Sequence, residues 1–156
     1  MRKVLGISLF VVLCFVFVGC DTDQEREYFE IGERATLRNE NVTLTQILGY
    51  SLDGIMLGQE NKYLLLEIEI TNTSSSNTTF RSSQFTLQTR DGGILRPTIR
   101  LVNDNDIRSR SVAPNGRITG TVEFEVRFGS SDLVLIYSPT GFSQQDIGFR
   151  IHSTLR

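Results

Sequence analysis

The 156-residue sequence predicts an all-β fold, an antiparallel sandwich of about seven to eight strands. In several segments apolar residues alternate with polar ones, the spacing that turns one strand face to a core and the other to water. Clusters of Gly, Asn, Asp and Ser separate these segments, as in chains that turn sharply between strands. No segment after residue 20 has the apolar spacing of an amphipathic helix. Two sheets packed about 10 Å apart would bury the apolar faces.

The alternating segments can be placed in order along the chain. In the first, one face carries Val42, Leu44, Gln46 and Leu48. In the second, it carries Leu64, Leu66, Ile68 and Ile70. The third has an apolar face from Ile118 to Phe128, opposed by a water-facing set of Thr119, Thr121, Glu123, Glu125 and Arg127. Residues 133–137 and 147–151 are expected to be the last two strands, and turns are expected at 53–54, 72–79, 91–93, 114–116 and 129–131.

The first 20 residues have the pattern of an export signal. The basic pair Arg2-Lys3 precedes an apolar run from residue 4 to residue 18, shorter than the about 20 residues of a membrane-spanning helix. The run ends in Val18-Gly19-Cys20, which resembles the lipobox of bacterial lipoproteins, with Phe17 where Leu is usual. The resemblance implies cleavage between Gly19 and Cys20 and a lipid on the nucleophilic Cys20 thiol. The alternative is a conventional or uncleaved signal in which Cys20 is unmodified.

The expected organisation is therefore a lipoprotein signal peptide at 1–19, a lipidated acidic tether at 20–31 and a sandwich domain at 32–156. Cleavage would remove two basic residues, leaving 14 basic and 18 acidic residues and a net charge of −4. This balance predicts no nucleic-acid binding. Cys20 would be the one remaining cysteine, which excludes an internal disulfide and a thiol nucleophile. The expected location is the extracytoplasmic side of a bacterial cell membrane or outer membrane; which of the two stays open.

Three segments of the chain carry a family resemblance. Residues 62–73, 85–92 and 112–126, in this order, resemble a large bacterial family of immunoglobulin-like extracellular lipoprotein domains of unknown function. The resemblance covers about residues 32–137 and implies an immunoglobulin-like sandwich. It supplies no catalytic residues, so it leaves the activity open.

Two stretches are candidate binding sites. An apolar, glycine-bounded loop carries Tyr50, Leu52, Ile55, Met56 and Leu57, and an exposed apolar loop is typical of a contact surface. The alternative is that this loop folds over the open end of the sandwich. An arginine-rich segment offers Arg96, Arg100, Arg108 and Arg110 as a candidate patch for an anionic ligand, because arginine forks suit carboxylate or phosphate. The alternative is a solvated surface that protects a sheet edge.

The sequence predicts no catalytic residues, no metal site and no cofactor. His152 is the only histidine and has no nucleophile motif around it, so we expect an exposed strand residue. The stretch Asn103-Asp104-Asn105-Asp106 offers oxygen ligands but lacks the spacing of a calcium loop, which leaves calcium binding open.

The predicted function is that of a non-catalytic binding or accessory module of the cell envelope, not an enzyme. It would be held at the membrane through its N-terminal lipid, with an envelope protein or glycan as partner. One alternative is a protease inhibitor, because some bacterial inhibitors are small sandwiches with a stretch similar to Ser83-Gln84-Phe85. The other is a passive surface antigen.

Overall fold

The computed structural model describes residues 26–51, 61–98, 105–127, 129–139 and 145–152. Within these ranges the chain forms eleven strands and one 3-10 turn, which confirms the all-β prediction. The count exceeds seven to eight because several short strands accompany the long ones. The elements are β1 (Glu27–Phe29), β2 (Arg34–Leu37), β3 (Glu40–Ser51), β4 (Asn61–Asn72), β5 (Thr78–Arg81), η1 (Ser82–Gln84), β6 (Phe85–Gln88), β7 (Ile94–Leu95), β8 (Ser109–Val112), β9 (Arg117–Arg127), β10 (Leu133–Tyr137) and β11 (Ile147–Ile151).

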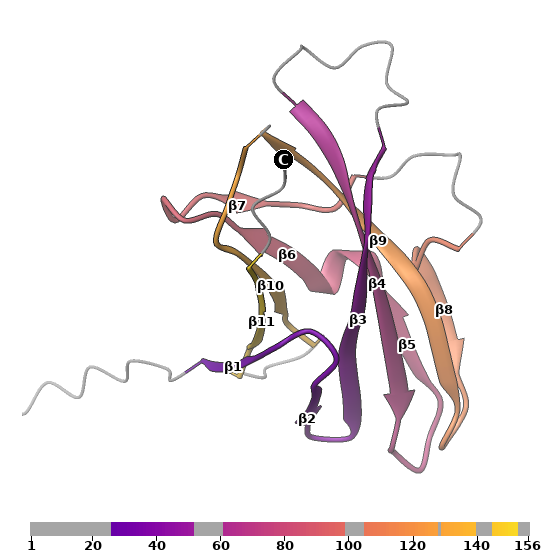
Figure 1. Ribbon diagram of the computed structural model, residues 1–156. Helices are drawn as coiled ribbons and strands as arrows, with labels where there is room; N and C mark the ends of the chain where they lie inside the picture. Colours follow the sequence, from indigo (N-terminus) through magenta and orange to yellow (C-terminus); the bar gives the residue numbers. More distant parts are fainter. Residues whose placement is uncertain (1–25, 52–60, 99–104, 128, 140–144, 153–156) are drawn as a thin grey trace, which may run out of the picture.

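The strands form two main sheets and a two-stranded ribbon (Figure 1). Sheet A has the order β1-β11-β10-β6-β7, sheet B has the order β2-β3-β4-β9, and the ribbon pairs β5 with β8. Neighbouring strands are antiparallel, as predicted, except that β1 runs parallel to β11. In the part of the chain that is described, no helix is long and apolar enough to cross a membrane.

The core lies between sheets A and B and follows the predicted alternation. On β4 every second residue from Leu64 to Ile70 is fully buried, and the residues between them are half-buried. Phe124 of β9 and Phe85, Leu135 and Phe149 of sheet A belong to the same cluster and are also fully buried. The bounds predicted for the last two strands match β10 and β11.

The prediction for β3 is wrong beyond Leu44. Register shifts follow Leu44 and Ile47, and a bulge moves the later residues to the opposite face. Ile47 therefore packs against the core, whereas Leu48, expected on the apolar face, is 47% exposed. The strand then continues to Ser51, so Tyr50 lies in β3, paired with Leu64, and not in the expected loop.

The water-facing side of β9 was also predicted incorrectly in part. Thr121 and Glu123 are buried, with 5% and 6% of their surface exposed. The neighbouring segment covers this edge of sheet B: Ile107 N donates to Thr121 O at 3.0 Å, and Thr98 N donates to Glu123 O at 2.7 Å. Gly120 allows this approach, because a Cβ there would lie 2.5 Å from Ile107 Cγ1.

Strand β1 lies inside the segment expected to be a tether, so the sandwich includes residues before 32. Glu27, Tyr28 and Phe29 pair with residues 147–149 of β11. The rings of Phe29 and Phe149 lie 5.8 Å apart, which ties β1 to the core.

The sandwich has two distinct ends. The lower end in Figure 1 is where β3 begins and β4 ends. Glu40 and Asn72, which pair there, are the first residue of β3 and the last of β4, and the Tyr137 hydroxyl of sheet A donates to Glu40 Oε2 at 2.5 Å. At the upper end β4 begins at Asn61, paired with Arg127, the last residue of β9. Glu27 pairs with Ile147, which itself pairs with Tyr137, so the chain enters the sandwich at the lower end.

Candidate functional site

Three cavities share lining residues: the second and third lie at the upper end, and the first lies beside η1 and the start of β6. The first, of about 430 Å³, is lined by Arg96 and by residues of η1 and β6. The second, also of about 430 Å³, shares Arg96 with the first and adds Asn61 and Arg127. The third, of about 660 Å³, shares Arg127 with the second and adds Arg90. We call these three cavities, with Arg90, Arg96 and Arg127, the arginine groove.

A tight turn between β6 and β7 shapes one wall of the groove. Thr89 N donates to Gly93 O at 2.9 Å, and Gly92 N donates to Thr89 O at 2.9 Å. Gly92 has a φ of +85°, a conformation that favours glycine, which confirms the Asp-Gly turn predicted at 91–93. The hairpin directs the chain back along the edge of β9, so Leu95 and Arg96 lie in one cavity with Arg127.

The charged groups of the groove differ in how they are held. Arg90 pairs with Asp132 at 3.5 Å, and both side chains are exposed. Asn61 Nδ2 donates to Glu125 Oε1 at 2.8 Å. Hydrogen bonds from the Thr89 hydroxyl and the Gly93 N–H hold the pKa of Asp91 below its ordinary value. Within the described ranges the Arg96 guanidinium has neither an ion pair nor a hydrogen bond.

The structure brings together a different set of arginines from the predicted patch. Arg96 lines two cavities of the groove, but Arg108 pairs with Asp106 at 3.3 Å and Arg110 lies on β8, and neither lines any of the three. Arg100 lies outside the described residues. Sequence reasoning missed Arg127, whose only signal is its position at the end of a predicted strand, just before a turn.

Several other predicted site residues are also outside the described ranges. They are Gly19, Cys20, Leu52, Ile55, Met56, Leu57, Asn103 and Asp104. Among the residues that the structure does describe, no three or more His, Cys, Asp or Glu side chains lie close enough together to hold a metal ion.

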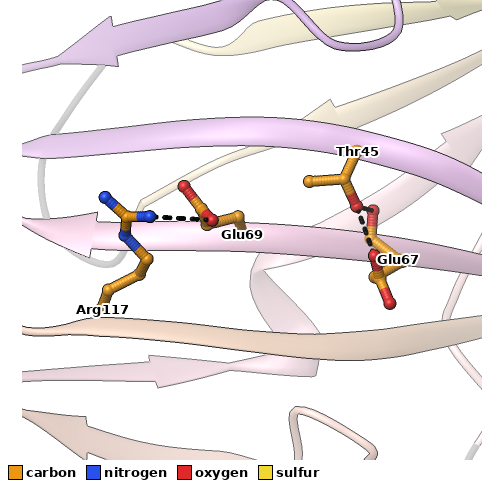
Figure 2. Close-up of polar contacts among 4 residues, drawn as sticks. All are labelled: Thr45, Glu67, Glu69 and Arg117. Atoms are coloured by element: carbon orange, nitrogen blue, oxygen red, sulfur yellow. Dashed lines mark hydrogen bonds and ion pairs between the residues drawn. The ribbon is translucent and has the colours of Figure 1, made fainter.

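The outer face of sheet B is polar, and its carboxylates are engaged by neighbouring strands (Figure 2). The Thr45 hydroxyl of β3 donates to Glu67 Oε1 at 2.8 Å and to the Glu67 carbonyl at 3.1 Å. On the other side of β4, Glu69 pairs with Arg117 of β9 at 3.3 Å. These contacts link β3, β4 and β9 across the outer face. The polar side chains of this face therefore have a structural role, which is to hold the three strands together.

His152 lies just after β11, where its ring is exposed, as expected from the sequence. Its Nε2 is 3.3 Å from Glu30, which also pairs with Arg150 at 3.6 Å. The Arg150 guanidinium lies 4.9 Å from the centre of the Tyr28 ring. These contacts hold the segment around β1 against β11.

The stretch Ser83-Gln84-Phe85 does not form an exposed loop of the kind that an inhibitor presents to a protease. Gln84 is 4% exposed and Phe85 is fully buried. Gln84 Oε1 accepts a hydrogen bond of 2.6 Å from Arg81 N, which closes η1. This stretch is therefore a structural turn that leads into β6.

The lower end contains a buried polar cluster around Asn72, which is fully buried. Its side-chain nitrogen donates to the carbonyl oxygens of Ser76 (2.8 Å), Val112 (2.9 Å) and Ala113 (3.2 Å). Its side-chain oxygen accepts from Ser74 N (3.0 Å), Ser74 Oγ (2.7 Å) and Thr78 Oγ1 (3.3 Å). One side chain thus joins the ends of β4 and β8 to the turn between β4 and β5.

The Tyr137–Glu40 hydrogen bond joins the two sheets at the same end. Burial raises the pKa of Glu40, although the hydrogen bond from Tyr137 and the charge of Arg38 act in the opposite direction. Burial and the neighbouring Glu40 carboxylate also raise the pKa of Tyr137, so the phenol stays protonated and remains a donor.

Solved structures with a similar fold come from bacteria. MPT63, a secreted protein from Mycobacterium tuberculosis, is 14% identical with a TM-score of 0.63, over 82% of this chain and 99% of that chain. The yjhA protein from Bacillus subtilis is 15% identical with a TM-score of 0.61, over 78% and 98%. The ycdA protein from Bacillus subtilis, described as a candidate lipoprotein, is 17% identical with a TM-score of 0.65, over 76% of this chain but only 38% of that chain. At such identities the likeness shows the β-sandwich fold alone.

A search of curated proteins finds no match. A family model does match, over residues 29–147, which is most of the chain and includes the strands from β2 to β10. The chain therefore belongs to the family described as domain of unknown function DUF4352.

Proposed function

We propose that this protein is a non-catalytic, lipid-anchored binding module on the extracytoplasmic side of a bacterial membrane, and that it binds its ligand in the arginine groove. One observation carries the proposal: the chain enters the sandwich at the lower end, and the second and third cavities of the groove lie at the upper end. A lipid on Cys20 would therefore place the groove on the side of the domain that faces away from the bilayer.

The length of the tether limits how far the lower end of the domain can lie from the membrane. Six residue steps separate Cys20 from Arg26, so the lipidated residue and the first described residue can be at most about 21 Å apart. Strand β9 spans 11 residues from the lower end to the upper end, about 36 Å at the usual rise of a strand. The lower end would stay close to the membrane, while the groove stays accessible.

The names of similar structures support the location. One is a secreted protein and another is described as a candidate lipoprotein, and both names fit a domain that works outside the cytoplasm. The signal pattern that ends in Gly19-Cys20 supports the same location. A binding role is supported by the groove itself, whose cavities combine arginine side chains with hydroxyl-bearing and apolar ones.

The test compares four proteins in intact cells: the native chain, Cys20→Ser, Arg96→Gln/Arg127→Gln and Arg34→Gln. Arg34 is the matched control, because it is exposed on β2, the strand of sheet B farthest from β9. Membrane fractions are assayed for the protein, and species captured by crosslinking are identified by mass spectrometry. We expect Cys20→Ser to leave the membrane fraction, and the double variant to stay there but lose the captured envelope component.

Three outcomes would contradict the proposal. Unchanged membrane association of Cys20→Ser would contradict the proposal that a lipid on Cys20 anchors the protein. If the native protein and the double variant captured the envelope component equally, the groove would not be the binding site. If the native protein captured nothing, the result would favour a passive surface antigen.

A further inference from the structure

We infer that the arginine groove binds an acidic polyol or glycan chain, in which phosphate or carboxylate groups alternate with hydroxyl-bearing units. The inference rests on the proposed function and adds the chemical class of the ligand. Three properties of the groove support it: its length, the spacing of its cations and the mixture of groups in its walls.

The length favours a chain over a single ion. Each cavity, at about 430, 430 and 660 Å³, has the size of a small-molecule pocket. The second and third share four lining residues, among them Leu95 and Arg127, and the first meets the second at Arg96. A lone phosphate would occupy a small part of one cavity. An extended ligand can fill the second and third cavities in succession and reach Arg96, where the first begins.

The cations are spaced along this length. Arg96 lines both the first and second cavities, Arg127 lines both the second and third, and Arg90 lines the third. A guanidinium binds carboxylate or phosphate with two parallel hydrogen bonds. Arg96 has no ion pair within the described ranges, and the exposed pair of Arg90 with Asp132 is of the kind that contributes little and exchanges easily. Anionic groups of a ligand can therefore bind at intervals.

The other walls exclude a densely charged polyanion. Asp91 and Glu125 line the third and second cavities, so a ligand with an anion at every position, such as a nucleic acid, would be repelled. Carboxylates accept hydrogen bonds from hydroxyl groups, and the hydroxyls of Thr86, Ser130 and Ser131 add further partners. Neutral hydroxyl-bearing units between sparse anionic groups match this pattern.

Apolar residues complete the surface. Leu95 and Val126 line the second cavity, and Pro97 lines the first. They offer contact to the carbon backbone of a polyol or sugar, which is apolar between its hydroxyls. The groove thus provides a partner for each part of the proposed ligand.

Binding is measured by titration calorimetry with the full lipidated protein in detergent micelles. Three oligomers of similar length are compared: a glycerol phosphate oligomer, an oligogalacturonate and a neutral maltooligosaccharide. We expect at least one acidic oligomer to bind at least about tenfold more tightly than the neutral one, with affinity falling as salt rises. The comparison of the first two oligomers shows whether phosphate or carboxylate is preferred.

Variants locate the site. Arg96→Gln and Arg127→Gln should each weaken binding of the preferred oligomer by about tenfold or more, because each removes a charged hydrogen-bond donor. Arg34→Gln should leave binding unchanged. The thermal midpoints of all three variants should match that of the native protein, which separates lost binding from lost folding.

The inference is overturned if no acidic oligomer binds, if the neutral oligomer binds equally well, or if Arg34→Gln weakens binding as much as Arg96→Gln. The two proposals can fail separately. Loss of capture in cells by the double variant, without binding of any acidic oligomer, would preserve the binding module and reject this ligand class. Binding of an acidic oligomer, together with an unchanged amount of Cys20→Ser in the membrane fraction, would preserve this ligand class and reject the lipid anchor.

Discussion

The two ends of the sandwich use polar side chains in opposite ways. At the lower end Asn72 is fully buried with six side-chain hydrogen-bond contacts, and the Tyr137–Glu40 pair joins the two sheets. At the upper end the guanidiniums of Arg90 and Arg96 lie at the surface beside cavities. Buried networks stabilise strongly when complete and are costly when broken, whereas exposed charges contribute little to folding. The comparison assigns stability to the lower end and leaves the upper end available for a ligand.

Asn72→Ala should have the largest effect on stability of all the substitutions proposed here, because it removes the centre of the lower-end cluster. It removes the partner of several buried carbonyl and N–H groups, so we expect it to lower the free energy of unfolding by about 3–4 kcal/mol. Urea unfolding followed by circular dichroism measures the change. Asn77→Ala is the control, because Asn77 is exposed in the same turn and its loss should change stability by less than about 0.5 kcal/mol. Similar effects of both substitutions would show that the turn itself, and not the Asn72 cluster, sets the cost.

Tyr137→Phe should have the next largest effect. The substitution keeps the buried ring but leaves the Glu40 carboxylate without its hydroxyl donor, so we expect a loss of about 2 kcal/mol. Tyr28→Phe is matched to it, since Tyr28 is 43% exposed and its packing over Gly148 uses only the ring. If the two substitutions cost the same, the link between the sheets contributes no more than a surface hydroxyl.

Most of the fold could be predicted because burial on one side of a strand leaves a period of two in the sequence. The fully buried residues of β4, from Leu64 to Ile70, and the bounds of β10 and β11 follow from that pattern. The pattern fails where a neighbour decides the outcome. The bulge after Leu44 depends on how β3 pairs with β4, and Glu123 is buried because a distant segment covers the edge of β9.

The candidate site was harder to predict for the same reason. Arg96 belongs to an arginine-rich stretch that can be recognised in the sequence, but its neighbour in the groove is Arg127, more than thirty residues away. Only the path of the β6–β7 hairpin along β9 brings them into one cavity. Arg108 and Arg110, close to Arg96 in sequence, continue instead into β8.

Gly148→Ala tests a position between the two ends and should have an intermediate effect. A Cβ at Gly148 would lie 2.9 Å from Tyr28 Cδ1 and 3.1 Å from Val134 Cγ1, so the Tyr28 ring must move. We expect a loss of about 1–2 kcal/mol, with faster hydrogen exchange in β1. In a Tyr28→Ala background the same substitution should cost less, because the main clash is gone. Equal costs in both backgrounds would contradict the role of Tyr28.

The smallest expected effects come from two carboxyl groups, one at each end, whose pKa values shift in opposite directions. The raised pKa of Glu40 means that its neutral form is favoured by folding; that contribution is present below the ordinary pKa of 4.5 and is lost as the pH rises through the higher folded pKa. The lowered pKa of Asp91 means that its ionised form is favoured; that contribution is present above 3.8 and is lost as the pH falls through the lower folded pKa. Urea midpoints of the native chain, Glu40→Gln and Asp91→Asn are compared near pH 7 and near pH 3.

Both substitutions keep an oxygen that can accept the original hydrogen bond, so the difference reports charge. Near pH 7 Glu40→Gln should be the more stable protein of its pair, because the native chain holds a partly buried charge there, and the gap should close near pH 3. Asp91→Asn should be slightly less stable than the native chain near pH 7, and this gap should also close in acid. If both substitutions shift stability in the same direction near pH 7, the two ends do not differ in how they treat a carboxylate. Stability changes of opposite sign would show that a charged carboxylate destabilises the lower end but stabilises the turn beside the groove. A charged group can be stable in that turn because the turn is exposed to water.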